Sequence, residues 1–135
     1  MSHLKVTDLL GDLPETSLSP ETSVRDACLL MERVGRKALP VMVDGWLVGV
    51  VAREDIARVV LQRRRDTATI PVSRIMSLSP IYLRGSTPVD VACAHMFDGG
   101  FRHLVVIDGG QVSGVLSLDD IPDSVRQMAR AADAA

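Results

Sequence analysis

Two stretches of the chain carry apolar residues at the spacing of a helix with one buried face. The spacing is i, i+3, i+4, i+7 in both, and it puts both cysteines of the chain on a buried stripe. The positions are Val24, Ala27, Cys28, Met31 and Val34 in the first stretch, and Val89, Ala92, Cys93 and Met96 in the second. Gly35 and Gly99-Gly100 are expected to end these helices, and Thr87 to cap the second one ahead of Pro88 at its first position.

Each helical stretch is followed by two short β-rich runs. The runs are residues 39–43 and 47–51 in the first half, and 104–107 and 112–116 in the second. Asp44-Gly45 and Asp108-Gly109-Gly110 separate them, which is typical of hairpins. Further helices are predicted over 54–65 and from 118 to about 132, and short strands at Leu18 and 81–83 precede the first helices. Each half is therefore a β-α-β-β-α unit.

The two halves are copies of one sequence. Residues 22–56 align without a gap with residues 87–121, and 13 of the 35 aligned pairs are identical. Upstream, residues 6–10 also resemble residues 72–76. We therefore divide the chain into a first repeat at 1–66, a linker at 67–71 and a second repeat at 72–135 with a C-terminal helix.

One such repeat leaves its sheet face uncovered, so the two copies are expected to pack together. The economical arrangement relates them by a pseudo-twofold axis and forms one α+β, sandwich-like domain. The space between the copies is then the expected ligand site.

Composition excludes several classes of protein. The 135 residues include 15 Lys and Arg against 17 Asp and Glu, so no broad basic surface favours nucleic acid. A domain of this length needs no metal or disulfide to stabilise its core. The start lacks the pattern of a secretory signal and the apolar runs are too short to cross a membrane, so we expect a cytoplasmic protein. No metal-ligand spacing, nucleophile elbow or phosphate-binding glycine loop is present, so neither catalysis nor a required cofactor is expected.

The hairpins and their closing motifs resemble one family. The segments 39–56 and 102–121, with a fixed spacing from Gly49 or Gly114 to a closing Asp-Ile pair, are similar to the CBS (cystathionine-β-synthase-type) domain. Ile75-Met76-Ser77 resembles the opening motif of that family. The resemblance covers nearly the whole chain. It implies a tandem pair, or Bateman module, that binds AMP, ADP, ATP or S-adenosylmethionine in clefts between the repeats and forms homodimers.

Asp120 and Ser117 are the strongest ligand candidates. At the junction of a strand and a helix, a carboxylate can accept both ribose hydroxyls while a serine hydroxyl and free helix N–H groups face a phosphate. The alternative is that they only cap the last helix. In the first repeat Asp55 is present but Ala52 replaces the serine, so we expect unequal sites. Each closing Asp also follows an acid, Glu54 or Asp119, which repels phosphate unless cations compensate.

Cations that precede the central strands supply that compensation. By resemblance, the first site combines Val115, Ser117, Asp120, Arg102 and His103 with Arg36, Lys37 and Thr16 of the other repeat. The pseudo-symmetric site uses Val50, Asp55 and Lys37 with Phe101, Arg102 and Ile81. A solvated loop is the alternative role for the basic residues. His103 would make phosphate binding sensitive to pH, unless it is simply hydrogen-bonded at a strand edge.

Two functions remain open from the sequence. The favoured one is a stand-alone regulatory sensor that binds an adenosine-type ligand and signals to a separate effector protein by conformational change. The other is a dimerisation or interaction platform that has lost its ligand. The sequence does not identify the ligand, the number of occupied sites, the geometry of the dimer or the effector.

Overall fold

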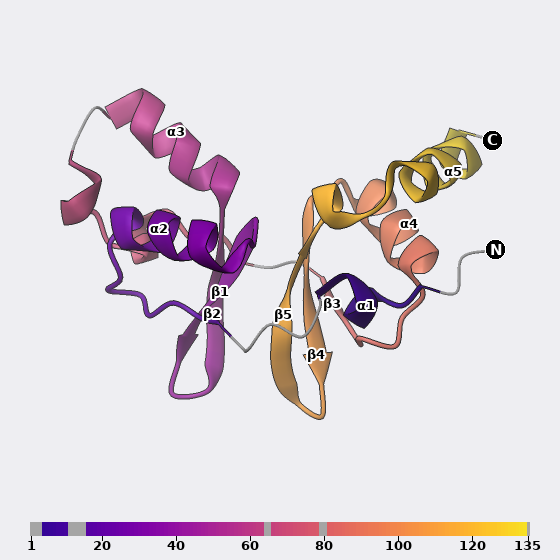
Figure 1. The fold of residues 1–135 in the computed structure, drawn as a ribbon, viewed down its shortest axis with the longest axis horizontal. Coiled ribbons are helices and arrows are strands. Elements are labelled where there is room, and N and C mark those ends of the chain that lie inside the picture. Colours follow the sequence, from indigo (N-terminus) through magenta and orange to yellow (C-terminus); the bar gives the residue numbers. More distant parts are fainter. Residues whose placement is uncertain (1–3, 11–15, 64–65, 79–80, 135) are drawn as a thin grey trace. The chain divides into compact units, whose positions relative to one another are not determined.

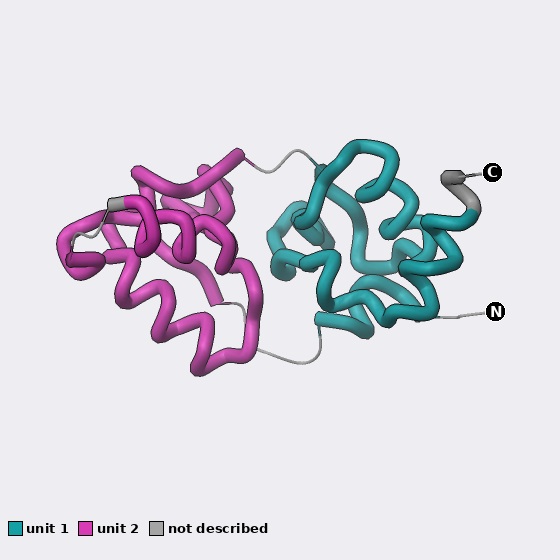
Figure 2. The backbone as a smooth tube through the Cα atoms, turned by 90° about the horizontal axis from the view of Figure 1, so that it is seen from above, with its two compact units in different colours: residues 1–12, 79–135 teal, residues 13–78 magenta. Residues whose placement is uncertain are grey.

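The chain forms two compact units. The computed structural model describes residues 4–10, 16–63, 66–78 and 81–134. Unit 2 comprises residues 13–78, whereas unit 1 combines residues 1–12 with residues 79–135 (Figure 2). The compact units therefore differ from the division at 1–66, 67–71 and 72–135, because the first residues of the chain join the second half.

Unit 2 holds the first helix and hairpin. Helix α2 (Val24–Val34) leads into β1 (Ala38–Val43), which pairs antiparallel with β2 (Trp46–Ala52), and α3 (Arg53–Arg63) follows (Figure 1). Leu18 forms a single parallel bridge with Val41. Short 3-10 helices follow at Thr67–Thr69 and Val72–Arg74.

Unit 1 repeats this arrangement with one more regular strand. It contains α1 (Val6–Leu10), β3 (Tyr82–Leu83), α4 (Val89–Gly99), β4 (His103–Asp108), β5 (Gln111–Ser117) and α5 (Asp123–Ala134). The sheet order is β3-β4-β5, with β3 parallel and β5 antiparallel to β4. Both units are mixed helix and strand, as the sequence predicted.

The opening segment of each repeat packs into the body of the other repeat. The Val6 N–H donates to the Thr87 carbonyl at 2.9 Å in unit 1, and the Val72 N–H donates to the Thr22 carbonyl at 2.8 Å in unit 2. Val6 and Val72 are both fully buried in the cores of these units. Because the two contacts are equivalent, the exchange of opening segments is reciprocal.

The same segments cover the glycines of the hairpin strands. Leu10 lies against Gly114 in unit 1, and Met76 lies against Gly49 in unit 2. A glycine leaves room at each position for the side chain that ends the exchanged segment. The core of each unit combines most of the predicted periodic positions with buried residues of these segments, whereas Cys28 and Val34, which the periodicity placed on the buried stripe, are only partly buried.

Local chemistry sets the helix ends. The Ser23 hydroxyl accepts from the Asp26 N–H at 3.0 Å and begins α2. Gly35 and Gly100 end α2 and α4 in the left-handed conformation, at φ +68° and +71°, which glycine adopts without strain.

Two predicted boundaries were wrong. The N-cap of α4 is Pro88 rather than Thr87, and it makes no side-chain capping hydrogen bond. The helix predicted from residue 118 is interrupted: a 3-10 turn at Leu118–Asp120 precedes α5, because Pro122 lacks the N–H that a continuous helix requires. The helix predicted over 54–65 corresponds to α3, and its predicted last residues, 64–65, lie outside the described residues.

Among the residues that the structure describes, no helix is long and apolar enough to cross a membrane.

Candidate adenosine-ligand site

The strand–helix junction of unit 1 brings three of the predicted residues together. Ser117 ends β5 and pairs with His103, which begins β4. The Ser117 N–H donates to Asp120 Oδ2 at 2.9 Å, and the Ser117 hydroxyl lies 2.7 Å from His103 Nδ1. Ser117 is buried, His103 and Asp120 are half-buried, and Asp119 is exposed.

Asp120 also caps the turn that follows the strand. Its carboxylate forms one part of a capping box with Ser117. The carboxylate therefore caps this short 3-10 turn and not the last helix, which begins at Asp123. This bond fixes the position of the Asp120 carboxylate. The contact of Asp120 with a ligand stays a prediction.

Arginines surround the second acid of this junction. Arg102 Nη2 lies 3.4 Å from both oxygens of Asp119, and Arg126 Nη1 lies 3.8 Å from one of them. The repulsion that Asp119 was expected to exert on a phosphate is thus offset by two cations. Sequence reasoning missed Arg126. Its signal was the pattern of basic residues on the last helix, but only the break at Pro122 brings that helix back to Asp119.

The junction of unit 2 has the same backbone geometry with different chemistry. Asp55 Oδ2 accepts from the Ala52 N–H at 2.9 Å, which matches the contact between Asp120 and Ser117. Asp55 Oδ1 lies 3.7 Å from Arg58 Nη1. No hydroxyl is available at Ala52, and α3 begins at once with Arg53. The two junctions therefore share the bond to the closing Asp and differ in their other side chains. That the two ligand sites are unequal stays a prediction.

The other predicted site residues divide between the units. Unit 1 holds Ile81, Phe101, Arg102, His103, Val115, Ser117 and Asp120, and unit 2 holds Thr16, Arg36, Lys37, Val50 and Asp55. Within each unit, Val50 and Val115 alternate with the core residues Val51 and Leu116, so they face away from the helices. A site that combines residues of both units stays a prediction.

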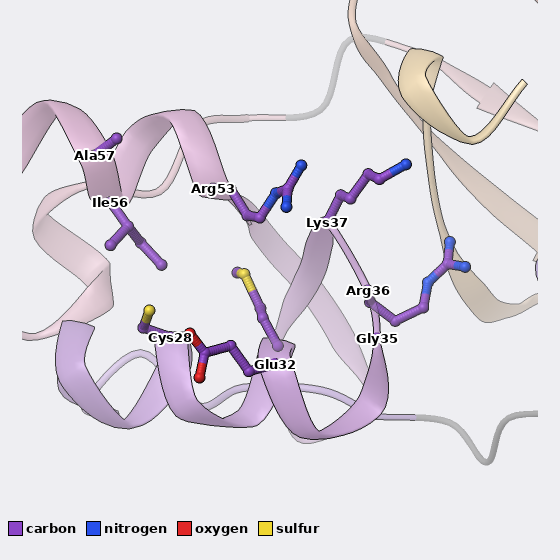
Figure 3. A pocket seen from close by; sticks show the side chains of 9 residues that line it. Cys28, Glu32, Gly35, Arg36, Lys37, Arg53, Ile56 and Ala57 are labelled. Atoms are coloured by element: carbon purple, nitrogen blue, oxygen red, sulfur yellow. The ribbon is translucent and has the colours of Figure 1, made fainter.

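Arg36 and Lys37 contribute to a separate feature within unit 2. They follow α2 directly, and the Lys37 carbonyl accepts from the Arg53 N–H at 3.1 Å. Both residues line a cavity of about 470 Å³ that the sequence did not predict (Figure 3).

Comparison with known proteins identifies the class of this repeated fold. The CBS domain family matches residues 7–62 and 72–125, which cover both repeats. The chain therefore belongs to the CBS domain family and is a tandem CBS protein.

Individual relatives extend the likeness over most of the chain. A protein with CBS domains from Burkholderia ambifaria is 32% identical, with a TM-score of 0.73 over 90% of this chain and 93% of its own. A CBS domain protein from Pyrobaculum aerophilum, solved in complex with AMP, is 26% identical, with a TM-score of 0.69 over 95% of this chain and 99% of its own.

Curated relatives differ in length. The CBS domain-containing protein CBSCBSPB1 of Arabidopsis thaliana is 30% identical over 115 residues, which are 83% of this chain and 21% of the relative. The chain spans 17 to 22% of five such Arabidopsis relatives.

Proposed function

We propose that this tandem CBS chain is a regulatory module that binds an adenosine-type ligand at the Ser117–Asp120 junction and signals to a separate protein. One observation carries the proposal: a backbone N–H holds Asp120 Oδ2 at 2.9 Å, beside the buried Ser117 hydroxyl and its partner His103. A carboxylate fixed in this way is preorganised to accept two ribose hydroxyls. The Pyrobaculum relative that was solved with AMP supports the ligand class.

The charge of the junction favours one phosphate over three. Arg102 and Arg126 lie next to Asp119, whose charge offsets part of theirs. The Ser117 hydroxyl is also engaged with His103, so a ligand phosphate competes with that bond. We therefore rank AMP and S-adenosylmethionine ahead of ATP.

The module would act by a shift of populations. A ligand changes the conformation of a protein only as far as it binds one state more tightly than another. The junction joins β5 to the segment that carries α5, so a ligand on Asp120 can reposition α5 relative to β5. We propose that this movement, in a homodimer of the module, alters the surface that a partner protein reads.

Calorimetry with AMP, ATP and S-adenosylmethionine tests the proposal on the wild-type protein and on Asp120→Asn. The asparagine oxygen can still accept from the Ser117 N–H, so the cap stays while the charge is lost. We expect Asp120→Asn to weaken AMP binding by about ten- to a hundredfold, because a hydrogen bond to a charged group contributes about 1.5–3 kcal/mol.

Asp98→Asn is the matched control, since Asp98 is an exposed acid of α4 and is not among the predicted site residues. The same titrations on Asp55→Asn measure the second junction, and we expect a smaller loss there because Ala52 offers no hydroxyl. Equal affinity in the wild-type protein and Asp120→Asn would contradict the assigned site.

A ligand-free interaction platform is the second candidate function. It is favoured by the capping bonds themselves, because both Asp55 and Asp120 already have a structural role. In that case no adenosine compound at millimolar concentration raises the melting temperature, whereas any ligand that binds the native state must do so. Sedimentation velocity on the same samples measures whether the protein is the dimer that both functions require.

A further inference from the structure

The two hairpins, β1-β2 and β4-β5 (Figure 1), each contain one Asp-Gly sequence, at Asp44-Gly45 and at Asp108-Gly109. The nitrogen of a glycine can reach the carboxyl carbon of an aspartate that precedes it, because glycine has no side chain in the way. The two sequences are therefore alike in their local chemistry. Their surroundings in the structure differ, and this difference decides which of them reacts.

In unit 2 the Asp-Gly sequence is the whole loop of the hairpin. Val43 at the end of β1 lies opposite Trp46 at the start of β2, and the exposed residues Asp44 and Gly45 lie between them. Asp44 has a φ of +48° and is the one non-glycine residue with positive φ among those that the structure describes. This conformation costs more free energy for a residue with a side chain than a strand conformation does. No described residue makes a hydrogen bond or ion pair with the Asp44 carboxylate, so this side chain can turn toward Gly45.

In unit 1 the aspartate lies in a strand and its carboxylate is held. Asp108 ends β4 opposite Gln111 of β5. Its Oδ1 accepts from the Gly85 N–H at 3.0 Å, and its Oδ2 accepts from the Ser113 hydroxyl at 3.1 Å. Both bonds must break before the carboxyl carbon can approach the Gly109 nitrogen. Because a hydrogen bond to a charged group is among the stronger ones, each bond should slow this approach by about tenfold.

We propose that Asp44 is a site of spontaneous isoaspartate formation in the folded protein, and that its hydrogen bonds protect Asp108 from the same reaction. The Gly45 nitrogen attacks Cγ of Asp44 and loses its proton, and the Cγ–OH bond of the protonated carboxyl breaks with release of water. The product is a cyclic succinimide. Water then adds to the main-chain carbonyl carbon of Asp44 and breaks its bond to the Gly45 nitrogen. One water leaves and one returns, so the reaction needs no other reactant.

The product changes the tip of the hairpin. In isoaspartate the chain runs through Cγ, which adds one methylene group to the main chain, and the former main-chain carbonyl becomes a carboxylate. A two-residue loop fixes the geometry of the strand pair next to it. The pair of Val43 with Trp46 should therefore lose its regular geometry first, at a position where the Trp46 side chain is 76% exposed.

Peptide mapping tests the proposal on the folded protein, incubated at mildly acidic pH and below its melting temperature. An isoaspartyl peptide has the mass of the original but separates from it in chromatography, and electron-transfer fragmentation locates the modified residue. We expect isoaspartate to accumulate at least about tenfold faster at Asp44 than at Asp108. In urea the two residues should react at similar rates, because Asp108 has then lost its hydrogen bonds.

Two results would overturn the proposal. One is an equal or faster reaction at Asp108 in the folded protein. The other is a folded protein without isoaspartate at Asp44 after a time in which the unfolded protein has been converted.

Ser113→Ala is the matched variant for the protecting bonds. It removes one of the two bonds to Asp108 and leaves both Asp-Gly sequences intact. We expect isoaspartate at Asp108 to form roughly three- to tenfold faster in this variant and the rate at Asp44 to stay the same. Asp44→Glu should abolish the modification of its loop, because glutamate would have to close a larger ring. Circular dichroism and the melting temperature verify that both variants are folded. An unchanged rate at Asp108 in Ser113→Ala would overturn the protective role of its hydrogen bonds.

This inference is independent of the adenosine proposal. Asp44, Asp108 and Ser113 are not among the predicted site residues, so Asp44→Glu and Ser113→Ala should bind AMP as the wild-type protein does. Conversely, Asp120→Asn should leave the rate of isoaspartate formation at Asp44 unchanged. Either proposal can therefore fail while the other stands.

Discussion

Gly49 and Gly114 occupy equivalent positions in the two hairpins, but their surroundings differ. A Cβ atom on Gly49 would lie 2.7 Å from Met76 Sδ and 3.1 Å from Met76 Cβ, whereas on Gly114 the nearest atom would be a Leu10 methyl at 3.5 Å. The short contacts at Gly49 reach from Sδ to Cβ of Met76, so an added methyl group would force the whole Met76 side chain to move. The contact at Gly114 is an ordinary van der Waals contact.

We therefore expect Gly49→Ala to destabilise the protein by about 1 kcal/mol and Gly114→Ala to be neutral or slightly stabilising. Overpacking costs about 1–3 kcal/mol, and the lower entropy of the unfolded chain returns about 0.4–1 kcal/mol. Urea denaturation of both variants measures the difference. A larger loss in Gly114→Ala than in Gly49→Ala would contradict this account.

The two cysteines should differ in reactivity. Burial raises the pKa of Cys93, and the nearby Arg126 and Arg130 only partly oppose that effect. A raised pKa means less thiolate at a given pH, and Cys93 is also fully buried. Cys28, in contrast, is one of the residues that line the cavity shown in Figure 3.

We expect a chromogenic disulfide reagent at pH 8 to modify Cys28 rapidly and Cys93 only at the rate at which the protein opens. A single fast thiol in the wild-type protein and none in Cys28→Ser is the predicted result. A fast thiol that persists in Cys28→Ser would show that Cys93 is accessible.

At the scale of elements, the opening segments are the informative feature. Val6 belongs to the first repeat in the sequence but lies in the core of unit 1, and Val72 belongs to the second repeat but lies in the core of unit 2. Each segment is held by backbone hydrogen bonds to the other repeat. A destabilising substitution in the opening segment of one repeat should therefore destabilise the unit that contains the body of the other repeat.

We expect Val6→Ala and Val72→Ala each to cost about 2 kcal/mol, because both remove buried methyl groups and leave a cavity. Hydrogen exchange should show lower protection of β4 and β5 in Val6→Ala, and of β1 and β2 in Val72→Ala. Loss of protection in the opposite hairpins would mean that each opening segment packs onto its own repeat.

Most elements could be predicted from the sequence because their signals are local. The periodicity of α2 and α4 and the glycine turns of the hairpins depend on neighbours a few residues apart. The errors at Thr87 and Pro122 also concern local chemistry, and they show how a proline shifts a helix boundary. In contrast, no local pattern indicates that α1 belongs with α4, since the contact of Val6 with Thr87 spans most of the chain.

For the whole molecule, the compact units predict which fragments fold. Residues 13–78 contain every member of the core of unit 2, including Ile70 and Val72. Residues 1–66, which correspond to the first sequence repeat, lack both of these side chains and carry an α1 whose partners are absent.

We expect the fragment 13–78 to show dispersed amide NMR signals and a cooperative thermal transition, and the fragment 1–66 to show neither. The fragment is small, so a low melting temperature is expected even when it folds. A cooperative transition in 1–66 and none in 13–78 would contradict the reciprocal exchange of opening segments.

The sequence by itself determined the repeated unit, the hairpins, the buried helix stripes and the two closing aspartates, because these follow from short-range periodicity and from the internal alignment. Only the tertiary structure decided which opening segment completes which unit. It alone shows that His103 is the partner of Ser117 and that Arg126 reaches Asp119. It alone also shows the cavity that residues of α2 and α3 line together with Arg36 and Lys37. The physical reason is one of range. Contacts between residues distant in sequence are selected by shape and burial across the fold, and the amino-acid sequence carries no periodic signal for them.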